Sequence, residues 1–204
     1  HALPRLRQQL APASLEVGSA QALLGIFRRS YTPAGDLLEL QPNQDRTRSY
    51  QQVGLARITW REQSRSALLL NLGSHPVEFS GMTILSSAFV GSLRSILRRD
   101  GVAHDVMFFQ GYAGDHKSGY DDGGTLRWIE NLEESIAMLN PLISAIKERL
   151  RGALRPVSGV FSCVREQINL PLVSPPKSLA HIAAPYQGKT YHLLFADWLQ
   201  TMQD

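Results

Sequence analysis

The sequence lacks several features that would assign a protein to a class directly. Its 204 residues include a single cysteine, Cys163, so no disulfide can form within the chain, and this residue is expected to pack as a small hydrophobe. No run approaches the roughly 20 apolar residues that a membrane-spanning helix needs. The opening HALPRLRQQL has no apolar stretch typical of a signal peptide. The Gly-x-Ser-x-Gly motif of many serine hydrolases is also missing.

The charge is weakly positive and widely spread, which bears on the partners to expect. The formal net charge is +3, and arginines occur in separated pairs such as Arg28 and Arg29, or Arg98 and Arg99. Nucleic-acid binding usually needs clustered basic residues interleaved with aromatic ones, so no nucleic acid is expected as a partner. Peripheral contact with an anionic membrane surface fits better, because basic segments gain roughly 1 kcal/mol per residue there.

The expected order of elements predicts an α/β fold with a mixed, largely parallel sheet flanked by helices. Hydrophobic residues make up 43% of the chain, enough for one domain with a sizeable core over residues 1–204. Partial alternation in 50–60 and the apolar run in 67–72 indicate two strands joined by a turn. A helix within 86–101 and a strand at 106–109 follow. Because such crossovers are right-handed, strands 67–72 and 106–109 are expected to be parallel.

The second half of the chain has less distinct patterns. Residues 111–124 are rich in glycine and predict a loop, which either lines a site or is a flexible surface connection. A helical apolar stripe covers 125–150 and is interrupted by Pro141, which either kinks one helix or begins a second. A final helix is expected at 191–202.

Two apolar runs end in polar turns that carry reactive side chains. The first, 67–70, gives way to a turn that ends at His75, and Pro76 keeps this histidine out of helical dihedrals. A role as metal ligand or acid–base group, and a histidine satisfied by backbone hydrogen bonds, both fit this pattern. The second run, 106–109, is followed by Gln110. Since ligands bind beyond the carboxyl ends of parallel strands, we expect both turns to form the floor of one pocket.

The motifs in these turns resemble those of the neutral, non-lysosomal ceramidase family. The chain reads HPVEFSG at 75–81, LSSAFVG at 85–91 and FFQGYAGD at 108–115. The family segments read roughly His-Pro-Thr, Ile-Ser-Ala-Asp-Tyr-Pro-Gly and Leu-Gln-Gly-Ala-Ala-Gly-Asp, in the same order and with similar spacing. GIFRRS at 25–30 is similar to the family's Asn-Arg-Arg segment. Members of this family are zinc amidases that cleave ceramide to sphingosine and a fatty acid.

The resemblance implies a zinc-dependent amidohydrolase acting on ceramide or another amide, and a secreted or periplasmic location. The chain would then be a portion of a larger catalytic domain. His75 corresponds to a zinc ligand of the family, and His116 and Asp115 are the nearest further candidate ligands. Asp115 and Ser118 are candidates for catalysis. The pocket wall would contain the remaining candidates for substrate binding: Gln110, Gly111, Gly114 and Lys117.

Several family positions are replaced in this chain. Lys117 stands where ceramidases have the catalytic serine of Gly-Asp-Val-Ser-Pro, so Ser118 would serve only if the loop shifted by one residue. Ala88 replaces the aspartate of the Ser-Ala-Asp motif. The Thr-His-Thr-His-Ser-Gly motif, which supplies another zinc ligand, does not occur. Two functions therefore stay open: a zinc amidohydrolase, and a metal-free scaffold or binding module of ceramidase-like fold.

Overall fold

The computed structural model describes residues 8, 10–31, 33, 37–38, 41–79, 83–160 and 162–169. The chain divides into two units, residues 1–159 and 160–204, and all the described helices and strands belong to the first. In the second unit, residues 162–169 have no regular secondary structure. Cys163 is exposed there, so the expectation that it packs as a small hydrophobe is wrong. The helix expected at 191–202 lies outside the described residues.

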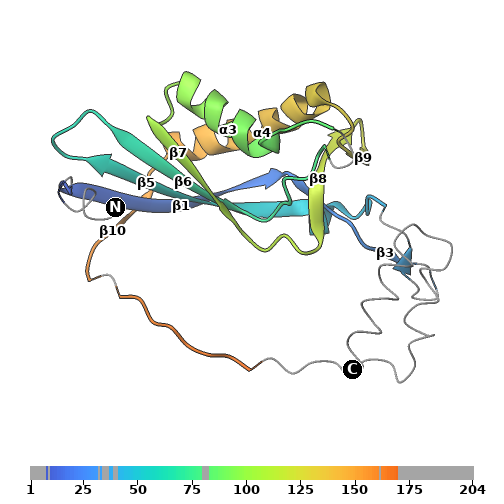
Figure 1. Cartoon of the computed structure of the whole chain (residues 1–204), viewed down its shortest axis with the longest axis horizontal. Helices are drawn as coiled ribbons and strands as arrows, with labels where there is room; N and C mark the ends of the chain where they lie inside the picture. Colours follow the sequence, from blue (N-terminus) through green and yellow to red (C-terminus); the bar gives the residue numbers. More distant parts are fainter. Residues whose placement is uncertain are drawn as a thin grey trace. The chain divides into compact units, whose positions relative to one another are not determined.

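A five-stranded sheet forms the centre of the first unit, in the order β10-β1-β5-β6-β7 (Figure 1). Its strands are β1 (Ala13–Leu23), β5 (Tyr50–Trp60), β6 (Ser66–Leu72), β7 (Asp105–Gln110) and β10 (Arg155–Val157). Only β6 and β7 are parallel, and the other three pairings are antiparallel. The α/β class and the mixed sheet are therefore confirmed, but the sheet is less parallel than expected. A tight turn reverses the chain between β5 and β6, and only the helical crossover produces a parallel pair.

The strand–helix–strand unit follows the sequence pattern closely. Between β6 and β7 lies α3 (Ala88–Arg99), which buries Phe89, Leu93 and Leu97. The helix ends in a Schellman motif, in which the amide of Val102 donates to the Leu97 carbonyl at 2.9 Å. Gly101 allows this ending because its φ of 70° is unfavourable for other residues.

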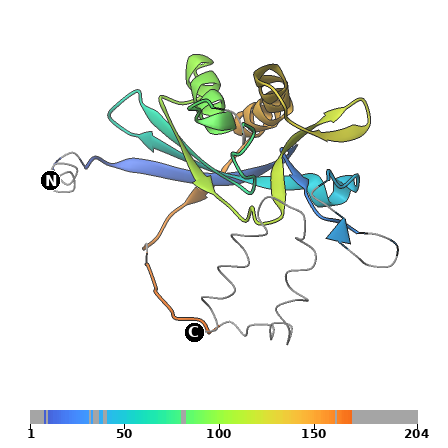
Figure 2. The same ribbon diagram turned by 45° about the vertical axis from the view of Figure 1, so that its right-hand side comes forward.

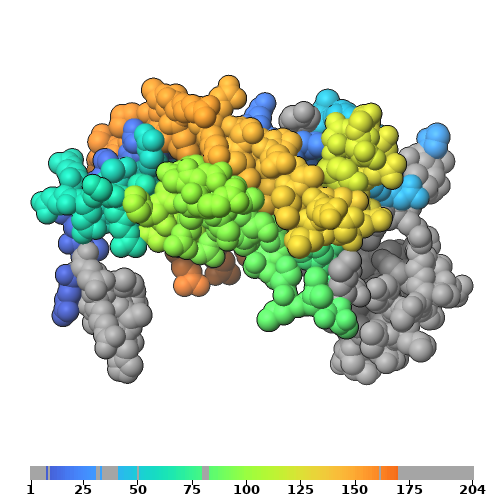
Figure 3. Space-filling view, turned by 90° about the horizontal axis from the view of Figure 1, so that it is seen from above, coloured from blue at the N-terminus to red at the C-terminus, as the bar shows by residue number. Residues whose placement is uncertain are grey.

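Two helices cover one face of the sheet, where the hydrophobic core lies (Figure 2). The second helix, α4 (Leu132–Arg151), lies beside α3 when this face is viewed directly (Figure 3). It runs through Pro141 without ending, although an interior proline costs about 3 kcal/mol. Pro141 is exposed, and the helix buries a long apolar stripe on its other side, which offsets that cost. The stripe consists of Met138, Leu139, Leu142, Ile143 and Ile146.

A small second sheet occupies the region that the sequence predicts as a loop and the start of a helix. It contains β2 (Gly25–Phe27), β8 (His116–Asp122) and β9 (Thr125–Trp128) in this order. The helix α4 begins only after β9, where the side chain of Asn131 accepts a hydrogen bond from the Glu134 amide at 2.9 Å. A short helix α2 (Arg46–Ser49) precedes β5, and the short strands β3 (Ser30–Tyr31) and β4 (Leu37–Leu38) pair with each other.

Candidate functional site

The turns after β6 and β7 are packed against each other, as the sequence predicts. The amide of Gly111 donates to the Leu72 carbonyl at 2.8 Å. A Cβ at Gly73 would overlap the backbone carbonyl of Tyr112, and one at Gly111 would lie 3.0 Å from the carbonyl carbon of Leu72. Gly73 therefore requires glycine, because a side chain there would push the two turns apart, and Gly111 is closely packed against the same segment.

Gln110 joins the two turns through its side chain. The carboxamide nitrogen lies 3.2 Å from the Ser74 carbonyl, 3.4 Å from that of Leu72 and 3.4 Å from that of Gly111. One amide group thus bridges backbone oxygens of both turns. In this arrangement Gln110 holds the two turns together and has its donor engaged within the protein, and the two joined turns are called the floor of the candidate site below.

His75 lies on this floor with its backbone held on both sides. Its amide donates to the His116 carbonyl at 3.3 Å, and its carbonyl accepts from the Ser118 hydroxyl at 2.7 Å. The residue forms an isolated parallel bridge with Lys117 of β8. Its imidazole is half-buried and makes no hydrogen bond or ion pair to any described residue. The imidazole is therefore available to a ligand while its backbone is fixed.

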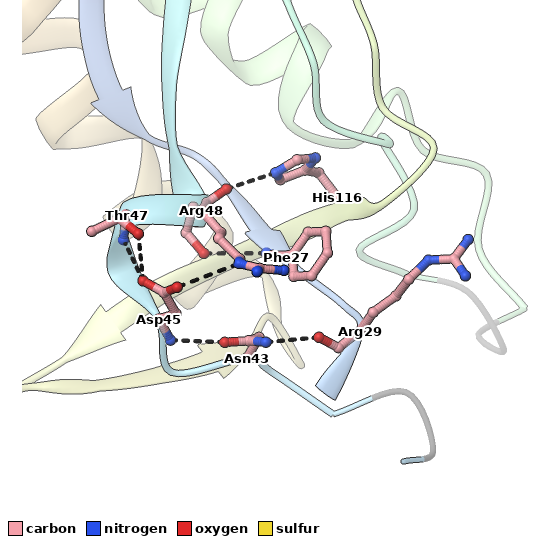
Figure 4. Close-up of polar contacts among 8 residues, drawn as sticks. Phe27, Arg29, Asn43, Asp45, Thr47, Arg48 and His116 are labelled. Atoms are coloured by element: carbon pink, nitrogen blue, oxygen red, sulfur yellow. Dashed lines mark hydrogen bonds and ion pairs between the residues drawn. The ribbon is translucent and has the colours of Figure 1, made fainter. Parts of the chain in front are cut away.

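The imidazole of His116 is already engaged elsewhere in the fold (Figure 4). Its Nε2 lies 2.9 Å from the Arg48 carbonyl, and its ring packs edge-on against Phe27 with centroids 5.7 Å apart. The guanidinium of Arg48 lies over the same phenylalanine ring, 5.2 Å from its centroid. A metal ion on Nε2 would have to displace the carbonyl contact.

The other predicted residues around His116 each have a defined place. Asp115 forms an ion pair with Arg29 on a half-exposed part of the surface. The ammonium of Lys117 lies 5.3 Å from the centre of the Trp128 ring. Ser118 is fully buried. Besides its bond to His75, the Ser118 hydroxyl lies 3.3 Å from the hydroxyl of Ser74. Gly114 has open space around its Cα, with no heavy atom within 4 Å of an added Cβ.

Gln51 is a polar residue near this floor that sequence reasoning missed. A Cβ at Gly25 would lie 2.7 Å from the carboxamide nitrogen of Gln51, and one at Gly73 would lie 3.5 Å from its oxygen. Both atoms are buried, and neither has a hydrogen-bond partner among the described residues. Buried amide groups are almost always paired, so the Gln51 carboxamide is an exception, and it lies packed between the backbone at Gly25 and the backbone at Gly73.

Glu78 is a second residue that sequence reasoning missed, and it links the His75 turn to α3. The residue is 4% exposed, and its carboxylate accepts a hydrogen bond from the Phe89 amide at 3.2 Å. Burial raises the pKa of this carboxyl, and the hydrogen bond from the Phe89 amide opposes the increase. Glu78 precedes Phe89, whose amide donates this hydrogen bond, by 11 positions. This spacing matches no local capping motif.

Glu78 leads to a testable prediction about pH. Because the pKa of the folded form is raised above the ordinary value of 4.5, the folded state holds the proton more tightly than the unfolded state. The stability of the wild type therefore falls as the pH rises from about 4.5 through the raised pKa. We expect Glu78→Gln, which can still accept from the Phe89 amide, to be the more stable form at pH 7 and to lose this advantage near pH 4. Urea unfolding at several pH values measures the difference in stability. If the wild type became more stable relative to the variant as the pH rises, the raised pKa of Glu78 would be contradicted.

The described residues do not form a complete metal site on their own. No group of three His, Cys, Asp or Glu residues within them is placed to hold a metal ion. None of the helices in the same part of the chain is long and apolar enough to cross a membrane.

The chain was compared with known protein families, with curated proteins and with solved structures. None of them matches it.

Proposed function

We propose that this chain is part of a zinc-dependent amidohydrolase related to the neutral ceramidases, with His75 as a metal ligand. The observation that supports the proposal is the state of His75. Its backbone is held through its amide and its carbonyl, and its imidazole makes no hydrogen bond or ion pair to any described residue. An imidazole whose ring nitrogens bond to none of the described residues suits Zn²⁺, and its place beyond the carboxyl ends of β6 and β7 suits a ligand-binding edge.

The residues present fit one ligand of such a centre, and the remaining ligands would come from outside the described residues. When bound, zinc would lower the pKa of its water to about 7 and polarise the carbonyl of an amide. The protein's own contribution is to position the imidazole through the Ser118 and His116 contacts.

A second function, a metal-free binding module, is favoured by the contacts of the other predicted site residues. His116, Asp115 and Ser118 each contact a partner within the fold: the Arg48 carbonyl, the Arg29 guanidinium and the His75 carbonyl. Side chains that stabilise the fold in this way need no catalytic role to explain their presence. In this case the floor formed by the two turns would hold a ligand without cleaving it.

Zinc content distinguishes the two functions. In the product of the complete gene, we expect elemental analysis to find one zinc ion per chain. We expect the His75→Ala variant to lose this zinc. His104→Ala removes a histidine at the other end of the same parallel strand pair and is expected to keep its zinc. A fluorescent ceramide should be hydrolysed by the wild type and by the control, and not by His75→Ala. A wild type without stoichiometric zinc and without amidase activity would overturn the hydrolase and favour the binding module.

A further inference from the structure

A basic cavity lies at the opposite end of β6 and β7 from His75. Its volume is about 800 Å³, and its lining includes Arg65, Ser95, Arg98, Arg99 and His104. These residues come from the end of α3, the start of β7 and the turn before β6. Because β6 has seven residues, the cavity is about 20 Å from the candidate site. It is therefore a separate feature of the molecule.

The lining has more positive than negative charge, and part of the positive charge is not neutralised. Arg65 is bound to Asp105 through two nitrogens, at 3.0 and 2.6 Å, and Arg99 to Asp100 at 2.9 Å. Arg98 is exposed, and its guanidinium has no ion pair or hydrogen bond to any described residue. The pairs with aspartate fix two guanidinium groups in place, and Arg98 contributes a full charge to the cavity.

Uncharged donors in the same lining point to the chemistry of the ligand. The Nδ1 atom of His104 accepts the Ser66 amide at 3.2 Å, so the proton of the neutral ring lies on Nε2, which is a donor. The hydroxyl of Ser95 adds another donor. Guanidinium groups bind phosphate oxygens in a bidentate manner, and a phosphate monoester offers several such oxygens. The Leu97 and Arg98 carbonyls at the helix end do not compete for these donors, because they accept the Val102 and Gly101 amides.

We propose that this cavity binds a phosphate monoester through Arg98 and His104, with Arg65 and Arg99 at its sides. The volume exceeds that of a phosphate ion and falls in the range of small-molecule sites, so the phosphate would carry a further group. That group is either a soluble organic moiety or the acyl-glycerol part of a lipid such as phosphatidic acid. The proposal is independent of zinc and of His75.

Calorimetric titration with inorganic phosphate tests the binding chemistry in the intact protein. We expect saturable binding to the wild type. Binding should be weakened about tenfold or more in Arg98→Gln, which loses a charged hydrogen bond, and should also be weakened in His104→Gln. The matched control is Arg127→Gln, which removes one positive charge from β9 in the other sheet and should bind as the wild type does. Absence of saturable binding, or equal weakening in the control, would overturn the proposal.

Vesicles identify the source of the phosphate group. If the ligand is a lipid, the protein should sediment with phosphatidylcholine vesicles that contain phosphatidic acid, and Arg98→Gln should not. Vesicles with phosphatidylserine carry negative charge without a phosphate monoester and should bind less. If inorganic phosphate binds and neither kind of vesicle does, the ligand is a soluble phosphate ester. Binding to both kinds of vesicle that is unchanged in Arg98→Gln would overturn the proposal, because it would show attraction to charge alone.

Discussion

Replacing Phe89 by alanine is expected to lower the free energy of unfolding by about 3–5 kcal/mol, the cost of removing a large buried aromatic side chain. Phe89 is fully buried in the second position of α3, and its ring packs edge-on against Phe108 of β7 with centroids 5.7 Å apart. Its amide is the donor to Glu78. The residue thus connects the helix, the edge strand and the turn that carries His75, so the loss should include both packing and the order of that turn.

Urea unfolding of the Phe89 variants measures this effect. Phe89→Leu keeps most of the apolar volume and serves as the matched control, with an expected loss well below that of alanine. An unchanged dependence on urea would show that both variants unfold from the same compact state. A loss below about 1 kcal/mol for Phe89→Ala would contradict the burial of this ring between α3 and β7, since a cavity of this size cannot be neutral in a close-packed core.

Gly73→Ala is expected to be the most damaging change within the candidate site. The added Cβ would overlap the carbonyl oxygen of Tyr112 and lie 3.0 Å from its carbon, and both atoms belong to the backbone. No rotation of a side chain can relieve this contact, so the turns after β6 and β7 must separate. We expect a loss of stability of about 1–3 kcal/mol or more, the range for overpacked sites. We also expect displacement of His75.

Gly114→Ala is the control for this substitution. The glycine lies in the turn after β7, its φ is not in the left-handed region, and nothing lies within 4 Å of an added Cβ. Its alanine variant should differ from the wild type by about 0.5 kcal/mol or less, the range typical of surface changes. Thermal unfolding gives the stabilities, and the histidine signals in NMR spectra report the environment of His75. Equal stability and equal His75 signals in both variants would show that the two turns are not in contact.

The accuracy of the sequence-based expectations depends on how local the interactions are. Strands β5 and β6, the helix α3 and strand β7 were predicted because each has its own pattern, and the glycine that ends α3 stands directly after its last turn. The strand β8 was not predicted, because HKSGYDD has no run of apolar residues. It pairs with β2, about 90 residues earlier, and Gly119 makes room for Ile26 of that strand. Such pairing leaves no trace within the segment itself.

In the candidate site, too, the features that depend on local pattern were predicted and those that depend on distant contacts were not. The adjacency of the His75 and Gln110 turns followed from strand order, and the structure confirms it. The partners of the other residues did not follow: His116 bonds to a carbonyl 68 residues away, and Asp115 to an arginine 86 residues away. Glu78 and Gln51 were missed for the same reason, since their importance lies in burial beside segments that are distant in the chain.

By itself, the sequence determined the strand–helix–strand unit, the point at which its helix ends, and the placement of one histidine at a sheet edge. These depend on apolar periodicity, on glycine at positive φ and on proline after His75, all of which act over a few residues. Only the tertiary structure decided that the sheet is mostly antiparallel, that α4 continues through Pro141, and that His116 and Ser118 contact the protein's own backbone. These outcomes depend on the burial of apolar surface and on pairing between distant segments, whose free energies outweigh local preferences.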